Sequence, residues 1–436
     1  MESPAFLDAS GKLERLIDWN VEVLMSRLAK VVAKRNIMVG LGKGPVVLRE
    51  NAPEGHLLES VSDVIEMPRF DPRIARHRSC NAGTTSIINQ AVRSQLRAYV
   101  SRIARCYKDV PFHNFEHASH VALSANKLIK RIISPKGEDY TQDKMDCERM
   151  VSLASDLHHS TSGISSDPLT QFAVVFAALV HDVDHAGVPN AQLVKEEDPI
   201  AVRYKHKSVA EQNSVQLALG ILCEHRYIDL QNCIFANSIE RSRFQQLVIN
   251  SVMATDIVDK ELRSLRADRW AKAFYGTDTY REKEEVTNHK AAIVIEHIIQ
   301  ASDVAHTMQH WHVFCKWNEK LYHEMYAAYL AGRSSKDPTV DWYENEIAFF
   351  DHYIIPLAQK LKQCGVFGLS SDEYLQYALA NRREWVSKGQ QVTKAIITRR
   401  ISIYGDDKSE RTRPSIAPII QPGMSSVSSD GHSDDP

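Results

Sequence analysis

The sequence lacks the features that mark membrane-spanning and secreted proteins. No apolar run reaches the ~18–20 residues that a transmembrane helix needs. The first residues, MESPAFLDASGKLERL, contain no apolar signal-peptide core. The seven cysteines are an odd number and form no CxxC pair, which argues against a disulfide framework and for a reducing compartment. We therefore expect a soluble protein of the cytoplasm.

An excess of charge of one sign is also missing. The formal net charge is −2 over 436 residues, so no overall basic field attracts nucleic acid. Hydrophobic residues make up 43% of the chain and charged residues 25%, as in ordinary globular proteins. A globular protein with no nucleic-acid partner is expected, with room for one large domain or two to three small ones.

Residues 11–35 show the apolar spacing of an amphipathic helix. The apolar residues follow one another in steps of four and three: Ile17, Val21, Leu24, Leu28 and Val31. This stripe covers only about two heptads, fewer than the three to four that define a coiled coil. Two alternatives remain, a homodimer through residues 11–35 or one helix that packs on its own domain. Residues 36–85 contain scattered Gly and Pro, so region 1–85 is predicted to be an N-terminal helix and connector.

Almost every stretch of residues 86–395 has helical periodicity. Segments such as SIINQAVRSQLRAYVSRIARCY and AAIVIEHIIQASDVAH place apolar residues three and four apart. There is no alternating strand pattern and no repeat of fixed length. The prediction is an all-α fold, with one compact multi-helix bundle domain over 86–395. Residues 396–436, rich in Ser, Pro, Gly and Asp, are predicted to be a disordered tail.

Four polar clusters interrupt these apolar segments. His113 and His117 are four residues apart in PFHNFEHASHV, a spacing that places both rings on one face of a helix. The apolar run 172–180 is followed directly by HDVDH. Glu211 lies in the segment SVAEQN, and Asp303 ends the apolar run of IIQASD. These residue types are the common nitrogen and oxygen ligands of metal ions.

His181 and Asp182 stand at the very end of the apolar run. An unpaired imidazole or carboxylate in such a place costs several kcal/mol unless something pairs it. One alternative is a helix end that the pair caps in solvent. The four clusters together favour a metal site. Two His–Asp clusters with an extra carboxylate suit two cations ~3.5–4 Å apart that hold a hydroxide between them, with a nearby histidine to protonate the leaving oxygen. The residues alone thus predict a metal-dependent phosphoester hydrolase.

The clusters resemble the motifs of the class I cyclic nucleotide phosphodiesterases. HNFEHASHV resembles the family pattern HNxxHAxxV, VHDVDHAGVPNAQLV resembles HDVDHxGxxN, and SVAEQN resembles SVxEN. ATDI, ASDVAH and AFFDHYIIPL match further blocks in the same order, over roughly residues 95–365. The resemblance implies an all-α domain of the HD/cyclic nucleotide phosphodiesterase type. It also implies hydrolysis of 3′,5′-cyclic nucleotides (cAMP, cGMP) to 5′-monophosphates, which terminates cyclic nucleotide signals.

The resemblance further implies the ligands and the general acid. His117, His181, Asp182 and Asp303 would hold a first metal ion, expected to be Zn²⁺. Asp182 would also bridge to a second ion, expected to be Mg²⁺ (or Mn²⁺), whose other ligands are mostly waters. His113 would protonate the departing ribose 3′ oxygen.

It also implies the residues around these groups. Three residues would orient metal-bound waters: His185, Glu211 and Thr255. Phe349 would stack on the purine, and Leu321 would form the opposite side of an apolar clamp.

Two positions depart from the family pattern. Glu346 stands where the family has the glutamine that reads the base. An ionised carboxylate only accepts hydrogen bonds, two from guanine but one from adenine, so a preference for cyclic GMP is predicted. A pKa raised by desolvation would restore a donor and remove that preference. Phe112 replaces the usual Tyr without removing a ligand, and activity is expected to survive.

Two other functions remain open from the sequence. One is a catalytically weak cyclic-nucleotide-binding scaffold, which only Glu346 favours. The other is an HD-type hydrolase of other phosphoesters, against which the block at 346–356 argues. The segment LERLIDWNVEVL resembles the lead-in to phosphodiesterase modules of large microalgal proteins that carry a membrane-bound cyclase. A fragment of such a fusion is therefore a further hypothesis.

Overall fold

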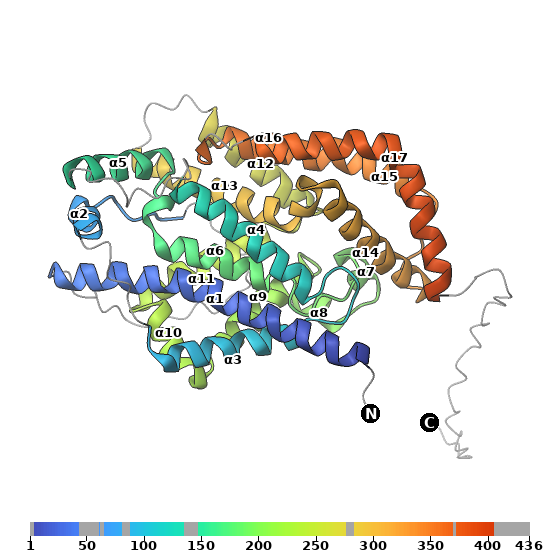
Figure 1. The fold of residues 1–436 in the computed structure, drawn as a ribbon, viewed down its shortest axis with the longest axis horizontal. Coiled ribbons are helices and arrows are strands. Elements are labelled where there is room, and N and C mark those ends of the chain that lie inside the picture. Colours follow the sequence, from blue (N-terminus) through green and yellow to red (C-terminus); the bar gives the residue numbers. More distant parts are fainter. Residues whose placement is uncertain are drawn as a thin grey trace, which may run out of the picture.

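The fold is built from helices. The computed structural model describes residues 4–42, 61, 65–80, 88–134, 147–275, 283–368 and 372–404. Within these ranges all regular structure is helical, which confirms the predicted all-α class (Figure 1).

Helix α6 (Pro168–Val180) is the centre of the domain, and every one of its residues is buried. Asp167 caps its first turn, because the Asp167 side chain accepts a hydrogen bond from the backbone N–H of Thr170. The helix packs against α1 (Pro4–Gly40), α4 (Phe115–Ile133), α11 (Ser238–Met253) and α13 (Lys283–Asp303). An apolar run with no polar face can only be covered on all sides, which explains this position.

Helix α1 places its apolar stripe inside the domain. Ile17, Val21, Leu24, Leu28 and Val31 are all buried in the main core, against α6 and α3. This arrangement corresponds to the intramolecular alternative for residues 11–35. A homodimer through the same positions would require α1 to leave the core, and it stays a prediction.

The other helices surround this centre. They are α2 (Pro72–Cys80), α3 (Gln90–Cys106), α5 (Cys147–Ser160), α7 (Asn190–Lys195), α8 (Pro199–Arg203), α9 (Val209–Leu222), α10 (Ile228–Ile234), α12 (Lys260–Phe274), α14 (Trp311–Leu330), α15 (Trp342–Phe349), α16 (Ile355–Gln363) and α17 (Glu373–Tyr404). Short 3₁₀ segments are η2 (Ile164–Ser166), η3 (His225–Tyr227) and η4 (Ala305–Met308), and a π-helical segment, η5 (Phe350–Ile354), joins α15 to α16. In Figure 1, α16 and α17 lie along the top and α1 and α3 along the bottom, while α2 and α5 sit together at the left.

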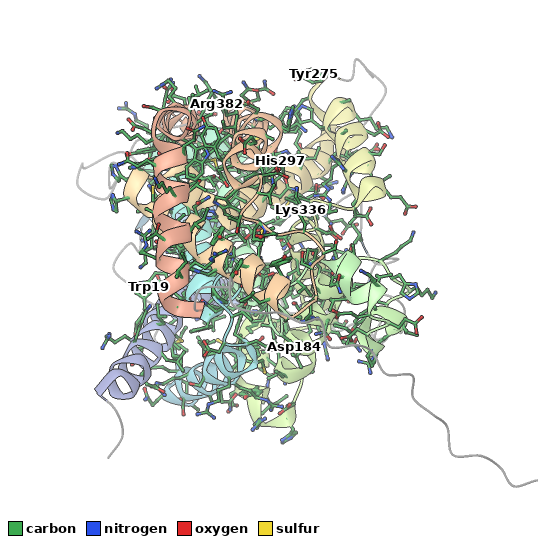
Figure 2. All side chains as sticks on the ribbon, turned by 90° about the vertical axis from the view of Figure 1, so that its right-hand side faces the viewer. Trp19, Asp184, Tyr275, His297, Lys336 and Arg382 are labelled. Atoms are coloured by element: carbon green, nitrogen blue, oxygen red, sulfur yellow. The ribbon has the colours of Figure 1, made fainter. Side chains whose placement is uncertain are left out.

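The chain ends of the domain differ in detail from the sequence prediction. Helix α17 continues to Tyr404, past the predicted start of the tail at residue 396, because Ile396 is buried in the core and Ile397 packs against it. Arg382, labelled on this helix in Figure 2, forms an ion pair with Asp351. Residues 405–436 lie outside the described residues.

The predicted connector, residues 36–85, is only partly described. It contains α2, and Ile65 and Met67 contribute to the core. Among the described helices, none combines the length and the apolar composition needed to cross a bilayer.

Candidate metal centre and general acid

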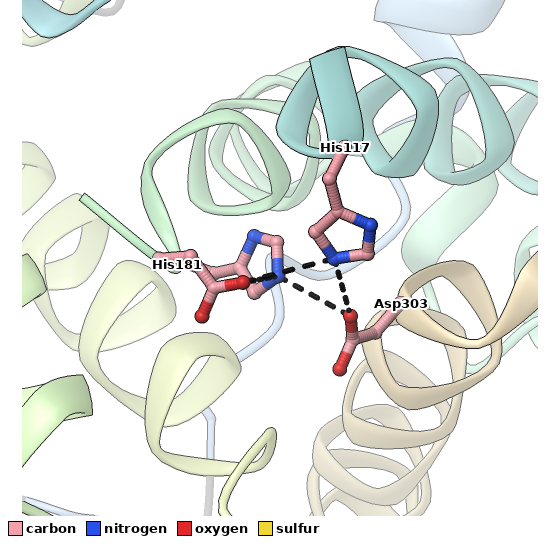
Figure 3. A group of neighbouring side chains, drawn as sticks. His117, His181 and Asp303 are labelled. Atoms are coloured by element: carbon pink, nitrogen blue, oxygen red, sulfur yellow. Dashed lines mark hydrogen bonds and ion pairs between the residues drawn. The ribbon is translucent and has the colours of Figure 1, made fainter. Parts of the chain in front are cut away.

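Three helix ends bring the four predicted metal ligands together. His117 lies in the first turn of α4, His181 and Asp182 directly follow α6, and Asp303 is the last residue of α13. Asn114 caps α4 by accepting hydrogen bonds from the backbone N–H groups of Glu116 and His117, which fixes the start of the helix and hence the place of His117. Figure 3 shows the labelled side chains of His117, His181 and Asp303 turned toward one another.

The spacing of the ligand atoms fits one metal ion. The Nε2 atom of His117 is 3.0 Å from Asp303 Oδ1 and 3.7 Å from Asp182 Oδ2. The Nε2 atom of His181 is 3.1 Å from Asp182 Oδ2 and 3.3 Å from Asp303 Oδ1. Ligands about 2.0–2.2 Å from a Zn²⁺ ion are roughly 3.4 Å apart in a tetrahedron. The four His–Asp separations are thus close to those around a single ion, and all four atoms lie within 4.8 Å of one another.

The protonation of the cluster also suits a cation. The Nδ1 atom of His181 donates to the carbonyl of Ala178 at 3.0 Å, so its Nε2 atom faces the two carboxylates. Burial alone would lower the pKa of His181, but Asp182 and Asp303 raise it well above its usual value, and a bound metal ion would take the place of the Nε2 proton. Burial alone would raise the pKa of Asp303, but the hydrogen bonds from His117 and His181 hold it well below its usual range. Burial would also raise the pKa of Asp182, but His181 holds it well below its usual range. Both carboxylates are therefore ionised at neutral pH.

Among the described residues, histidines are the ion-pair partners of the two carboxylates. Within the described part of the chain, the ion-pair partners of Asp182 and Asp303 are the imidazoles of His117 and His181, with no lysine or arginine. Negative charge at this depth is costly unless a cation compensates it. A divalent metal ion would supply that charge, and the donor set of two imidazole nitrogens and two carboxylate oxygens suits Zn²⁺.

A second group lies beside the ligands. His113 Nδ1 forms a short hydrogen bond with Glu324 Oε1, and the other oxygen of Glu324 accepts from the backbone N–H groups of Phe112 (2.8 Å) and His113 (2.9 Å). The His113 ring stacks at a tilt on that of His185, with centroids 4.0 Å apart. Burial opposes a charged His113, but the Glu324 carboxylate outweighs it and raises the pKa of His113 to about 9. His113 therefore carries a proton at neutral pH.

Sequence reasoning missed Glu324. Its carboxylate is buried on α14, with the side chain 4% exposed. A signal was present, because Glu324 follows Trp317 by seven residues and Phe314 by ten, which places it on the apolar face of the helix. A lone acidic residue on such a face indicates a buried polar partner.

The residues predicted to orient metal-bound waters lie in different surroundings. Glu211 Oε2 accepts from Asn190 Nδ2 at 2.9 Å, while burial and the nearby charge of Asp256 raise the pKa of Glu211 to about 8. Burial and the charge of His113 lower the pKa of His185 to about 4, so this ring is neutral. The hydroxyl of Thr255 donates to the carbonyl of Val252 at 2.8 Å and keeps its acceptor capacity.

The predicted base-reading region lies on α14 and α15. Glu346 is buried on α15 and its Oε2 accepts a hydrogen bond from Asn318 Nδ2 at 2.9 Å. Burial raises the pKa of Glu346 to about 8, which the Asn318 amide only partly offsets. Phe349 and Leu321 are partly buried and pack at the edge of the core, and the Phe349 ring stacks on Tyr353 with centroids 5.4 Å apart.

Comparison with known families agrees with this geometry. The family model for 3′5′-cyclic nucleotide phosphodiesterases matches residues 112–366, more than half of the chain. The chain belongs to this enzyme family. The matched range contains the four predicted ligands, His113, Glu324 and Glu346.

Individual relatives are distant. A probable 3′,5′-cyclic phosphodiesterase of Caenorhabditis elegans, pde-3, is 24% identical over 64% of this chain and 41% of its own length. A cGMP-specific phosphodiesterase of Dictyostelium discoideum is 21% identical over 72% of this chain and 58% of its own. The chain thus spans about half the length of these curated relatives.

A solved structure has the same fold. The phosphodiesterase domain of the RhoPDE fusion protein from the choanoflagellate Salpingoeca rosetta superposes with a TM-score of 0.52 at 18% identity, over 79% of this chain and 98% of that domain. At this identity the likeness concerns the fold.

Proposed function

We propose that this chain hydrolyses 3′,5′-cyclic nucleotides to 5′-monophosphates and so terminates cyclic nucleotide signals. The observation that carries the proposal is the convergence of two imidazole nitrogens and two carboxylate oxygens at one point, within 4.8 Å of one another, with the His113–Glu324 pair beside them. Membership in the family supports the choice of substrate.

Four residues would hold the first metal ion, which we propose to be Zn²⁺: His117, His181, Asp182 and Asp303. Asp182 would also contact a second ion, proposed to be Mg²⁺ or Mn²⁺. Bound ions would neutralise phosphate charge and make water nucleophilic near pH 7. The chain itself contributes two ionised carboxylates and two imidazole Nε2 atoms that already face the site.

His113 is proposed as the general acid. Its Nδ1 is engaged by Glu324, so the proton that it transfers is on Nε2. Because Glu324 raises the pKa of His113 to about 9, the ring is protonated at neutral pH and can donate to the departing 3′ oxygen. His185, Glu211 and Thr255 are proposed to orient water around the carboxylates.

Phe349 and Leu321 are proposed to hold the purine, with Glu346 at its edge. A Glu346 carboxyl with a pKa raised to about 8 is mostly neutral at pH 7. This is the condition under which the predicted preference for cyclic GMP disappears, since a neutral carboxyl both donates and accepts. We therefore expect hydrolysis of both cyclic AMP and cyclic GMP at neutral pH.

The cellular setting is also part of the proposal. The described cysteines are free thiols, which supports a reducing compartment such as the cytoplasm. Attachment to a membrane-bound cyclase and a homodimer remain hypotheses.

The deciding experiment measures hydrolysis of cyclic AMP and cyclic GMP by the purified chain, with and without a strong chelator, together with metal content by mass spectrometry. We expect chelator-sensitive release of 5′-monophosphate and two metal ions per chain. Tight nucleotide binding without turnover, with metals bound, would instead favour the scaffold. Turnover of other phosphoesters alone would favour an HD-type hydrolase.

A further inference from the structure

One guanidinium group bridges the turn that carries Thr255. This turn consists of Ala254, Thr255 and Asp256 and directly follows α11. Arg266, on α12, donates from Nη1 to the carbonyl of Ala254 at 2.8 Å and from Nη2 to the carbonyl of Asp256 at 2.5 Å. The arginine therefore holds the main chain on both sides of Thr255.

Gln300 adds a third hydrogen bond to the same turn. Its Nε2 atom donates to the carbonyl of Ala254 at 2.8 Å, and its side chain is buried on α13, one turn before Asp303. The Ala254 carbonyl thus accepts one donor from α12 and one from α13. The helix that ends in a predicted metal ligand also fixes the turn of Thr255.

The side chain of Asp256 ties the turn to the start of α9. Asp256 Oδ2 accepts a hydrogen bond from Ser208 Oγ at 2.7 Å. Asn190 Nδ2 lies 2.9 Å from Glu211 Oε2 and 3.4 Å from Asp256 Oδ2. The turn of Thr255 is therefore bonded to the helix that carries Glu211, another residue predicted to orient water.

Arg266 makes contacts that only an arginine can make together. It is half-buried, and among the described residues its hydrogen bonds all go to main-chain carbonyls, the third from Nε to Leu262 at 3.0 Å. No carboxylate in the described part of the chain forms an ion pair with it, so the cost of desolvating its charge is not offset by an opposite charge. Its planar fork of N–H donors holds two acceptors at fixed positions, which the point charge of a lysine does not.

We propose that Arg266, supported by Gln300, is a positioning residue that fixes the turn of Thr255 so that the Thr255 hydroxyl orients water at the metal site. This inference rests on the proposed function, in which Thr255 has that role. The hydroxyl donates to the carbonyl of Val252, so its lone pairs are left to accept a hydrogen bond from water. Arg266 acts through the two carbonyls and does not contact the water itself.

The first test is hydrolysis of cyclic AMP and cyclic GMP by Arg266→Lys, which keeps the charge but loses the fork. We expect kcat to fall about tenfold, as for other residues that support a metal site from outside its ligands. KM and the content of tightly held metal should stay at the wild-type level. Arg263→Lys, an exposed change on the same helix, is the matched control and should keep the wild-type kcat.

Gln300→Met is a second variant with the same readout. It keeps the volume of the side chain but removes the donor to Ala254, which Arg266 still holds. Its kcat should fall in the same direction by a smaller factor. If Arg266→Lys is found unfolded in denaturant titrations, a wild-type kcat in folded Gln300→Met overturns the proposal.

A double-mutant cycle separates positioning from packing. Thr255→Val removes the hydroxyl at nearly constant shape and should also lower kcat about tenfold. Because Arg266 is proposed to act through Thr255, adding Arg266→Lys to Thr255→Val should lower kcat no further. A structural effect independent of Thr255 would multiply instead, to about a hundredfold loss in the double variant.

Binding of Mn²⁺ alone, followed by electron paramagnetic resonance, gives a readout without turnover. In protein that retains its tightly held metal, the Kd for added Mn²⁺ should rise about tenfold in Arg266→Lys and in Thr255→Val alike. Arg263→Lys should bind Mn²⁺ as the wild type does. Wild-type Mn²⁺ binding in Arg266→Lys would overturn the link between this arginine and the metal site.

The outcomes for this inference and for the proposed function are distinct. Wild-type hydrolysis together with an unchanged kcat in Arg266→Lys, or with losses that multiply in the double variant, overturns the positioning role and leaves the proposed function intact. Absence of turnover of both nucleotides by the wild type overturns the proposed function and this inference with it.

Discussion

The two ends of α6 carry buried charge in opposite ways. At its start, the Asp167 carboxylate accepts hydrogen bonds from Arg243 Nη2 (2.6 Å) and Thr170 Oγ1 (2.6 Å) and pairs with Lys34 at 3.2 Å. Burial would raise the pKa of Asp167, but the two cations hold it well below its usual range. At its end, Asp182 faces Asp303 and histidines, with no lysine or arginine in an ion pair among the described residues.

The contrast separates a carboxylate that lysine and arginine neutralise from two carboxylates that face histidines. Asp167 is neutralised by the chain itself, so nothing needs to bind there and its role is to cap and anchor α6. The carboxylates at the other end, Asp182 and Asp303, are ionised, and their oxygen atoms lie within 4.8 Å of each other and of the two histidine nitrogens. Their ion-pair partners among the described residues are histidines, which are also metal ligands, so a bound cation could replace the histidine protons there.

The largest effect is expected for loss of a ligand. Asp303→Asn should lower turnover by about 10³-fold or more, because a carboxylate ligand and its charge are removed from the metal site. Metal content by mass spectrometry should fall with it. Asp184→Asn is the matched control: Asp184 lies two residues after Asp182 with a left-handed φ of 67° that asparagine tolerates. It should keep its metal, and full metal occupancy in Asp303→Asn would contradict the ligand assignment.

The opposite end of α6 should respond in stability instead. Arg243→Ala leaves buried Asp167 with Lys34 as its one cation, and should lower the free energy of unfolding by about 3 kcal/mol in denaturant titrations. The folded variant should keep its metal content. Because folding lowers the pKa of Asp167, this stabilisation is present above the unfolded pKa of about 4 and is lost as the pH falls below it. The difference from wild type should therefore shrink in acid.

The exposed Arg241, on the same helix, is the control for this change. Arg241→Ala should alter the free energy of unfolding by about 0.5 kcal/mol or a little more. Equal losses in the two variants would show that Asp167 does not depend on Arg243.

Removal of the general acid is expected to act on rate alone. His113→Gln should lower kcat by about 10²-fold, the usual contribution of a general acid, while metal content stays at the wild-type level. His312→Gln, an exposed histidine on α14, should leave kcat unchanged. Wild-type turnover in His113→Gln would remove this residue from the mechanism.

The smallest effect is expected for the partner of that acid. In Glu324→Gln the charge that raises the pKa of His113 to about 9 is gone, so His113 loses its proton at lower pH. The alkaline limb of kcat/KM should move to lower pH, with about tenfold less activity at pH 8. Glu319→Gln, on the same helix, should keep the wild-type profile. An unmoved alkaline limb would show that Glu324 does not control the protonation of His113.

Local sequence patterns pointed to the candidate ligands but not to the residues that contact their neighbours. His and Asp residues that follow or interrupt apolar segments indicated a metal site, and the family resemblance named His117, His181, Asp182 and Asp303, which the structure brings together. Glu324 is 211 residues from His113, and nothing local links the two. The same holds for Asn318, whose hydrogen bond to Glu346 depends on how α14 and α15 pack.

The apolar stripe of residues 11–35 is a second case in which a local pattern does not identify the partner. Its spacing fits both a coiled coil and a helix on a domain surface, since both need one apolar face. Only the packing against α6 and α3 shows which partner this face meets in the domain.

By itself the sequence determined the helical class, because apolar residues three and four apart recur along most of the chain, and it marked the His and Asp residues that the family resemblance proposes as metal ligands. The tertiary structure decided which carboxylates have lysine or arginine partners, which face histidines, and which carboxyls keep their protons. Those properties depend on burial and on neighbours distant in sequence, as at Asp167, His113 and Glu346, and no local pattern records them.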